Sequence, residues 1–186
     1  MKLQYRKICA ISAAVLFAVA AGVFFFAGSP RDLWVDDTLY SSEILEAAQR
    51  HALPPELVRA VVFQESRFDP RARGAKGEIG LMQLLPEGAV AEWSRICKKK
   101  CPGEDQLFDP ALNLEIGCWY LGRALRRWKD YKDCVELALI QYNAGEARAK
   151  RWKPDSHEES VLPRIKLRTT RRYVEQITKR YRNYMQ

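Results

Sequence analysis

One glutamate in the sequence is a candidate for acid–base chemistry. Glu65 lies near the end of segment 54–68, which is otherwise mostly apolar. Its carboxyl shares a helical face with the apolar residues three, four, seven and eight positions earlier, namely Val62, Val61, Val58 and Leu57. Partial burial and a position in the last helical turn both disfavour the ionised form, so we predict a raised pKa. A carboxyl that stays protonated near neutral pH can act as a general acid.

The helix that carries Glu65 has recognisable boundaries. Prolines and an acid at 54–56 suit the first turn of a helix, whereas Pro70 disfavours helical geometry at Asp69. The helix is therefore predicted to end near Phe68. Glutamates at the end of a helix are most often solvated, so a purely structural role is the alternative interpretation. A catalytic role therefore needs support from other segments of the chain.

The remaining elements predict a mainly α fold. Helices are expected at about 39–51, 86–97, 109–128, 133–143 and 169–184, with Asp109 capping one helix and Thr169 or Thr170 capping the last. Residues 69–86 are rich in glycine and proline, which predicts a loop or small β-hairpin. Residues 150–168 are expected to be a connecting segment. No internal repeat is present.

Two segments could bring polar groups to a ligand near Glu65. Gln83 lies in the glycine-rich loop that follows the Glu65 helix, where the backbone can approach a ligand closely. Tyr142 and Asn143 end a predicted helix, where a ring and an amide could meet a sugar. The structural alternatives are a loop that fills the core and a half-buried tyrosine.

Composition indicates a folded, basic domain. The chain has 186 residues, of which 47% are hydrophobic and 11% aromatic. The formal net charge is +8, and residues 148–186 hold 12 Lys or Arg against 4 Asp or Glu. This excess favours an anionic partner, such as nucleic acid, a lipid surface or an acidic polymer. No nucleic-acid-binding motif accompanies the charge, so we expect no nucleic-acid partner.

The N-terminal sequence predicts export. Lys2, Arg6 and Lys7 precede an uncharged, mostly apolar run over residues 8–30. We interpret residues 1–30 as an uncleaved transmembrane helix, with a cleaved signal peptide as the alternative. This interpretation predicts a single-pass protein of the cytoplasmic membrane, with a linker at 31–38 and a domain at 39–186 on the extracytoplasmic side.

Cysteines in the predicted domain are even in number. An oxidising compartment would favour two disulfides among them, with the pairing left open: Cys97, Cys101, Cys118 and Cys134. Zinc binding is the weaker alternative, because one Cys-x-x-x-Cys pair has no second close pair or suitable histidines.

A series of short motifs resembles a known family. In chain order they are Glu65-Ser66, Gly80-Leu81-Met82-Gln83, Asn113-Leu114 with Gly117 and Tyr120-Leu121, Tyr142-Asn143-Ala144-Gly145, and Tyr173-Val174. Over residues 39–184 they resemble the catalytic domain of the soluble-Slt-type lytic transglycosylases, which has a goose-lysozyme-like fold. The resemblance implies a helical, lysozyme-like domain that cleaves the β-1,4 bond between N-acetylmuramic acid and N-acetylglucosamine in peptidoglycan.

The resemblance also implies roles for individual residues. Glu65 matches the single catalytic acid, and Ser66 matches the residue that orients it. Positions that match the walls of the glycan-binding groove are Met82, Gln83, Tyr142, Asn143 and Ala144. Tyr173 matches a tyrosine of the terminal helix that faces the active site.

The implied mechanism needs one carboxyl and neither a metal nor an organic cofactor. Glu65 would protonate the leaving oxygen, then accept the proton of the muramic acid 6-hydroxyl as that group closes a 1,6-anhydro ring. We expect no second catalytic carboxylate, because Asp69 adjoins a turn and Glu78 lies in a loop. The loop departs from the family pattern at Arg73, Lys76 and Glu78.

Two other functions are compatible with the sequence. A lysozyme-type muramidase would cleave the same bond with water. A non-catalytic module would bind the cell wall beside an envelope or secretion assembly, using the basic surface.

Overall fold

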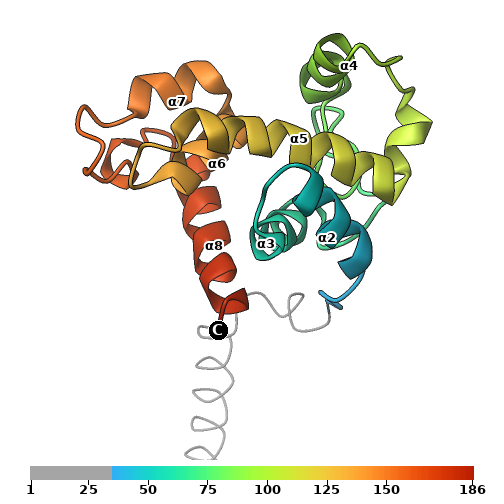
Figure 1. Cartoon of the computed structure of the whole chain (residues 1–186), viewed down its shortest axis with the longest axis horizontal. Coiled ribbons are helices and arrows are strands. Elements are labelled where there is room, and N and C mark those ends of the chain that lie inside the picture. Colours follow the sequence, from blue (N-terminus) through green and yellow to red (C-terminus); the bar gives the residue numbers. More distant parts are fainter. Residues whose placement is uncertain (1–34) are drawn as a thin grey trace, which may run out of the picture. The chain divides into compact units, whose positions relative to one another are not determined.

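The structure, a computed structural model, describes residues 35–186, of which residues 37–186 form one compact unit (Figure 1). Its α-helices are α2 (Ser41–Arg50), α3 (Pro55–Ser66), α4 (Ala91–Cys97), α5 (Pro110–Trp128), α6 (Cys134–Ala144), α7 (Glu146–Trp152) and α8 (Arg168–Tyr184). Short helical turns are η2 (Pro86–Val90), η3 (Glu104–Phe108) and η4 (Leu162–Arg164). The mainly α fold is confirmed.

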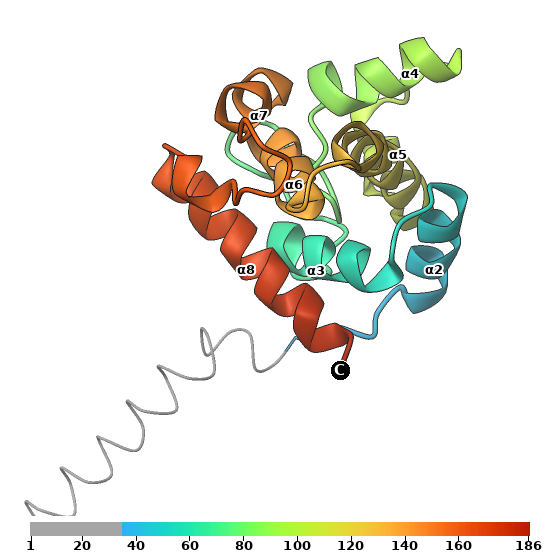
Figure 2. The same ribbon diagram turned by 60° about the vertical axis from the view of Figure 1, so that its left-hand side comes forward.

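The long helix α5 is central to the packing. It contacts α2, α4 and α6, while α8 packs along α3 and α6 (Figures 1 and 2). The Asp109 side chain caps α5 as predicted, accepting a hydrogen bond from the backbone N–H of Leu112 at 2.8 Å. Because α3 lies against α8, the end of α3 that carries Glu65 faces residues more than one hundred positions later in the chain.

The loop between α3 and η2 contains only isolated antiparallel bridges, Arg73 with Ile79 and Ile79 with Leu84. The alternative of a regular hairpin is therefore not found in this segment. Gly80 has a φ of +77°, and a Cβ there would lie 2.3 Å from Nδ2 of Asn113. The loop thus approaches α5 at a distance that only glycine allows. Close packing on α5, instead of regular strand pairing, holds this loop in place.

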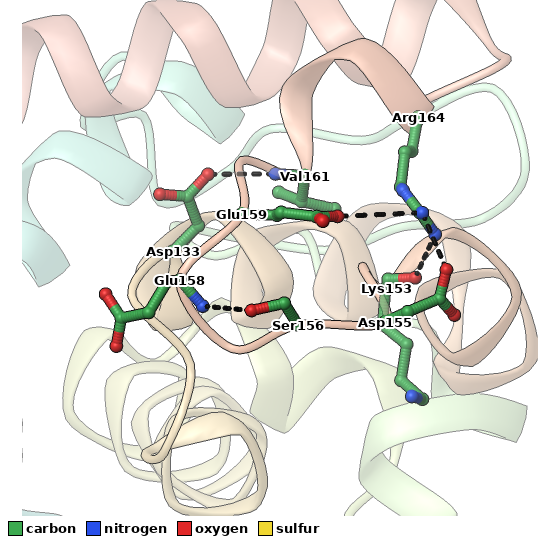
Figure 3. A network of polar contacts seen from close by, with 8 residues as sticks. All are labelled: Asp133, Lys153, Asp155, Ser156, Glu158, Glu159, Val161 and Arg164. Atoms are coloured by element: carbon green, nitrogen blue, oxygen red, sulfur yellow. Dashed lines mark hydrogen bonds and ion pairs between the residues drawn. The ribbon is translucent and has the colours of Figure 1, made fainter.

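Residues 145–167 differ from the prediction. Helix α7 was not expected, because four of its seven residues are charged and it buries only Ala149 and Trp152. After α7, Asp133 accepts hydrogen bonds from the Val161 N–H at 2.9 Å and the Ser160 hydroxyl at 2.8 Å. Arg164 pairs with Asp155 at 2.8 Å (Figure 3). Segment 153–167 is therefore an ordered strap.

The predicted cap of the last helix is wrong. Helix α8 begins at Arg168, and its N-cap position is Leu167, without a capping side chain. The Thr170 hydroxyl instead donates a hydrogen bond to Oδ1 of Asn143 at 2.9 Å. A contact between two helices has replaced the local cap.

The predicted single-pass location in the cytoplasmic membrane is corrected. Among residues 35–186 no helix is long and apolar enough to cross a bilayer. The longest of them, α5, contains one glutamate and three arginines. The run 8–30, on which the prediction rested, lies outside the described residues.

The predicted disulfides are also corrected. All four cysteines of the described chain are free thiols: Cys97, Cys101, Cys118 and Cys134. Cys118 is fully buried in α5, and burial raises the pKa of its thiol well above the ordinary value. It is therefore a protonated, apolar core residue. Nor do His, Cys, Asp or Glu side chains in residues 35–186 gather in threes that could hold a metal ion.

Candidate active site

Glu65 lies in the last turn of α3 and meets Tyr173 from the middle of α8. The Tyr173 hydroxyl donates a hydrogen bond to Oε1 of Glu65 at 2.5 Å. Tyr173 is buried, whereas Glu65 is half-buried and retains access to solvent. A buried donor thus fixes one carboxyl oxygen of Glu65.

Burial raises the pKa of Glu65 from 4.5 to about 7. The Tyr173 hydrogen bond lowers this pKa, and the negative charge of Glu78 raises it, each by less than burial does. The predicted rise is confirmed, with desolvation as its main cause. At neutral pH the carboxyl therefore occupies both protonation states, as an acid–base catalyst requires.

The loop that follows α3 is attached to the Glu65 helix next to the carboxyl. The Ser66 hydroxyl donates a hydrogen bond to the Leu81 carbonyl at 2.9 Å, a contact that holds the loop against α3. Gln83 has a φ of 48°, and its Nε2 donates to the carbonyls of Gly80 at 3.0 Å and Ala72 at 3.2 Å. Ser66 and Gln83 therefore fix the backbone of this loop.

Met82 belongs to this loop, and it is fully buried. Its N–H donates to Oδ1 of Asn113 at 2.8 Å, and its carbonyl accepts from the Tyr142 hydroxyl at 2.8 Å. A Cβ on Gly117 would lie 2.2 Å from the Met82 sulfur. The structure thus places the Met82 side chain against α5, with its backbone bonded to α5 and α6.

Asn113 is a supporting residue whose motif was noted in the sequence but for which no role in the site was predicted. Its amide is fully buried and donates to the carbonyls of Ile79 at 2.9 Å and Leu107 at 2.8 Å, while its oxygen accepts from Met82. The available signal was a polar residue on the apolar stripe of α5, one turn before Gly117.

The end of α6 forms the other side of the site. Tyr142 packs edge-on against Tyr120, with ring centroids 5.6 Å apart. Asn143 is exposed, apart from its hydrogen bond with Thr170 of α8. Ala144 is half-buried at the last position of α6, and its carbonyl accepts from Arg148 at 3.0 Å.

Electrostatics link these residues to Glu65. Burial, and then the charge of Glu65, raise the pKa values of Tyr142 and Tyr173 well above 10. Both hydroxyls therefore stay protonated and act as hydrogen-bond donors at neutral pH. The structure brings Glu65 together with Tyr142 and Tyr173, and the loop joins them through Ser66 and Met82.

Comparisons with known proteins show which family this chain resembles in sequence. A family described as the transglycosylase SLT domain matches residues 42–161. The chain is 32% identical over 100 residues to membrane-bound lytic murein transglycosylase E of Buchnera aphidicola subsp. Acyrthosiphon pisum. The matched region covers 52% of this chain and 45% of that protein. It is 33% identical over 123 residues to the transglycosylase of Enterobacteria phage PRD1, covering 65% of this chain and 41% of that protein.

Solved structures show the same fold. An inactive mutant of the lytic transglycosylase Slt from Pseudomonas aeruginosa is similar with a TM-score of 0.70 and 27% identity, over 79% of this chain and 24% of that chain. The 70-kDa soluble lytic transglycosylase of Escherichia coli has a TM-score of 0.69 and 24% identity, over 80% of this chain and 25% of that chain. The chain thus spans less than half the length of these proteins.

Proposed function

The chain belongs to the transglycosylase SLT domain family, and from this premise we propose that residues 39–186 are a catalytic domain that cleaves peptidoglycan without water. The bond cleaved is the β-1,4 link between N-acetylmuramic acid and N-acetylglucosamine. One observation carries the proposal: Glu65, the candidate acid, has a pKa of about 7 and is held by a buried tyrosine. Relatives named lytic murein transglycosylases support the choice of substrate.

The first step uses Glu65 as an acid. Its proton passes to the oxygen that links the two sugars, and the bond from this oxygen to C1 of the muramic acid breaks. The leaving sugar departs with a new hydroxyl, and positive charge develops at C1. The Tyr173 hydroxyl, 2.5 Å from Oε1, stabilises the carboxylate that remains.

The second step uses the same group as a base. The carboxylate of Glu65 takes the proton of the 6-hydroxyl while O6 bonds to C1 and closes the 1,6-anhydro ring. Glu65 is protonated again and ready for another cycle. A pKa near 7 suits this exchange, because neither protonation state is costly at neutral pH.

We assign the predicted groove residues to two kinds of role. Gln83 and Asn143 would contact the glycan through Oε1 and Nδ2, the side-chain atoms that their hydrogen bonds within the protein do not use, with Ala144 and Tyr142 beside them. Ser66 and Met82 would act through the loop backbone, since both are held in contacts within the protein. Tyr173 would orient Glu65.

Anionic peptides of the glycan strands are the partner that we propose for the basic surface. The exposed basic residues of α8 are Arg168, Arg172, Lys179 and Arg182. Co-sedimentation of Glu65→Gln with insoluble peptidoglycan at increasing salt measures this binding. Recruitment by an envelope or secretion assembly is a finer proposal, which affinity capture with this variant would test.

Product analysis tests the reaction. Mass spectrometry of digested peptidoglycan should give 1,6-anhydro-muramic ends with the wild type, and roughly 100-fold to 10,000-fold less product with Glu65→Gln. Circular dichroism controls for folding of the variant. Products heavier by one water, with reducing ends, would instead identify a muramidase, and lysis retained by Glu65→Gln would refute the assigned acid.

A further inference from the structure

A second carboxylate lies in the loop beside the candidate acid. Oε2 of Glu78 accepts a hydrogen bond from the Lys76 N–H at 2.8 Å, and the Glu78 carbonyl accepts one from the Gly74 N–H at 2.8 Å. Gly77 completes the turn with a φ of 87°. The turn therefore fixes one oxygen of Glu78, while residues 35–186 provide no hydrogen-bond partner for the other.

The Glu78 carboxyl lies next to Gln83, a predicted residue of the glycan-binding groove. A Cβ at Gly74 would lie 2.3 Å from Oε2 of Glu78 and 2.8 Å from Oε1 of Gln83. The ends of the two side chains thus lie over the same side of Gly74, where a Cβ would displace them. Glu78 is half-buried rather than fully solvated, and it lies beside the residue that we assign to glycan contact.

This part of the loop is attached to the Glu65 helix. Ser66, the neighbour of Glu65, bonds to the Leu81 carbonyl, and Ile79 pairs with Leu84 across the turn. The charge of Glu78 also reaches Glu65, whose pKa it raises. Around Glu65, α8 contributes Tyr173 and α6 contributes Tyr142, both neutral, and among residues 35–186 the charge that shifts the pKa of Glu65 is that of Glu78.

We propose that Glu78 is a second carboxylate of the active site, which stabilises the positive charge that develops on the muramic acid as the glycosidic bond breaks. Fixed charges aimed at developing charge are among the strongest catalytic effects. Glu78 would form no bond to the sugar: O6 still attacks C1, and the proton still returns to Glu65. This inference rests on the proposed function and revises the expectation that Glu65 acts without a second carboxylate.

The substitution Glu78→Gln tests the charge while preserving the turn. Its amide oxygen can still accept the Lys76 N–H bond, so the fold should be unchanged. On a soluble peptidoglycan fragment we expect kcat to fall roughly 10-fold to 100-fold, with KM within about twofold of wild type. The alkaline limb of the rate–pH profile should move to lower pH, because loss of the negative charge lowers the pKa of Glu65.

Two further variants distinguish the charge effect from a structural one. Glu78→Asp keeps the charge on a shorter side chain and should recover part of kcat. Glu87→Gln removes an exposed carboxylate from η2 and should leave both kcat and the pH profile unchanged. Equal losses in Glu78→Gln and Glu87→Gln would overturn the proposal.

The outcomes separate this inference from the proposed function. Wild-type kcat and an unshifted pH profile in Glu78→Gln, with anhydro products intact, would overturn the role of Glu78 alone. A wild type that releases no anhydro products would overturn the proposed function and, with it, the role of Glu78.

Discussion

The loop 67–85 and the strap 153–167 both lack α-helix, yet different interactions hold them. The loop is anchored by buried hydrogen bonds, chiefly those of Asn113, whereas much of the strap is held by exposed ion pairs of Arg164 (Figure 3). A buried polar group left unpaired costs about 1 to 3 kcal/mol, whereas an exposed ion pair contributes little. The loop beside Glu65 is therefore held in its conformation more strongly than the strap.

Removing Asn113 should have the largest effect on this contrast. Asn113→Ala leaves the Met82 N–H and the carbonyls of Ile79 and Leu107 without their buried partner. We expect the free energy of unfolding to fall by roughly 3 kcal/mol or more, as measured by denaturant unfolding. Asn183→Ala, at an exposed position of α8, is the matched control. A similar small loss in both variants would remove the distinction between loop and strap.

A smaller effect is expected where the buried contacts tune the chemistry. Tyr173→Phe removes the hydrogen bond that lowers the pKa of Glu65, so that pKa should rise above about 7. Because the acid must be protonated, the alkaline limb of the rate–pH profile should move up by about one unit, while kcat falls roughly tenfold. Tyr184→Phe, on the same helix but bonded to Asp37, should shift neither. A downward shift in Tyr173→Phe would contradict the assignment.

The smallest effect is expected in the strap. Arg164→Ala breaks exposed pairs with Asp155 and Glu159 and one hydrogen bond to the Lys153 carbonyl. The midpoint of thermal unfolding should fall by less than about 2 °C, and lytic activity should be unaffected. If Arg164→Ala lowered the free energy of unfolding as much as Asn113→Ala does, the ion pairs would stabilise the strap as strongly as the buried amide stabilises the loop.

Local signals in the sequence predicted much of the fold. Asp109 with Pro110 marks the start of α5, and the apolar face behind Glu65 predicted both the buried helix and the raised pKa. These features depend on neighbours within a few residues, which periodicity and capping describe well.

Features that depend on contacts between distant segments were not predictable. The charged sequence of α7 gives a weak periodic signal, and Thr170 bonds across to Asn143 instead of capping its own helix. The role of Asn113 depends on the Ile79 carbonyl in the loop and the Leu107 carbonyl in η3. The burial of Cys118 depends on the helices around α5. Composition could not indicate which of these polar or sulfur-containing side chains would face the interior.

The raised pKa of Glu65 also makes the stability of the domain depend on protons. The folded chain holds this proton up to about pH 7, whereas the unfolded chain releases it near 4.5, so unfolding in that interval liberates a proton. The contribution of Glu65 to stability is therefore complete below pH 4.5 and is lost as the pH rises to about 7. Its full size is roughly 3 kcal/mol. Acidification of the surroundings would thus raise the free energy of unfolding through Glu65, the group that performs the chemistry.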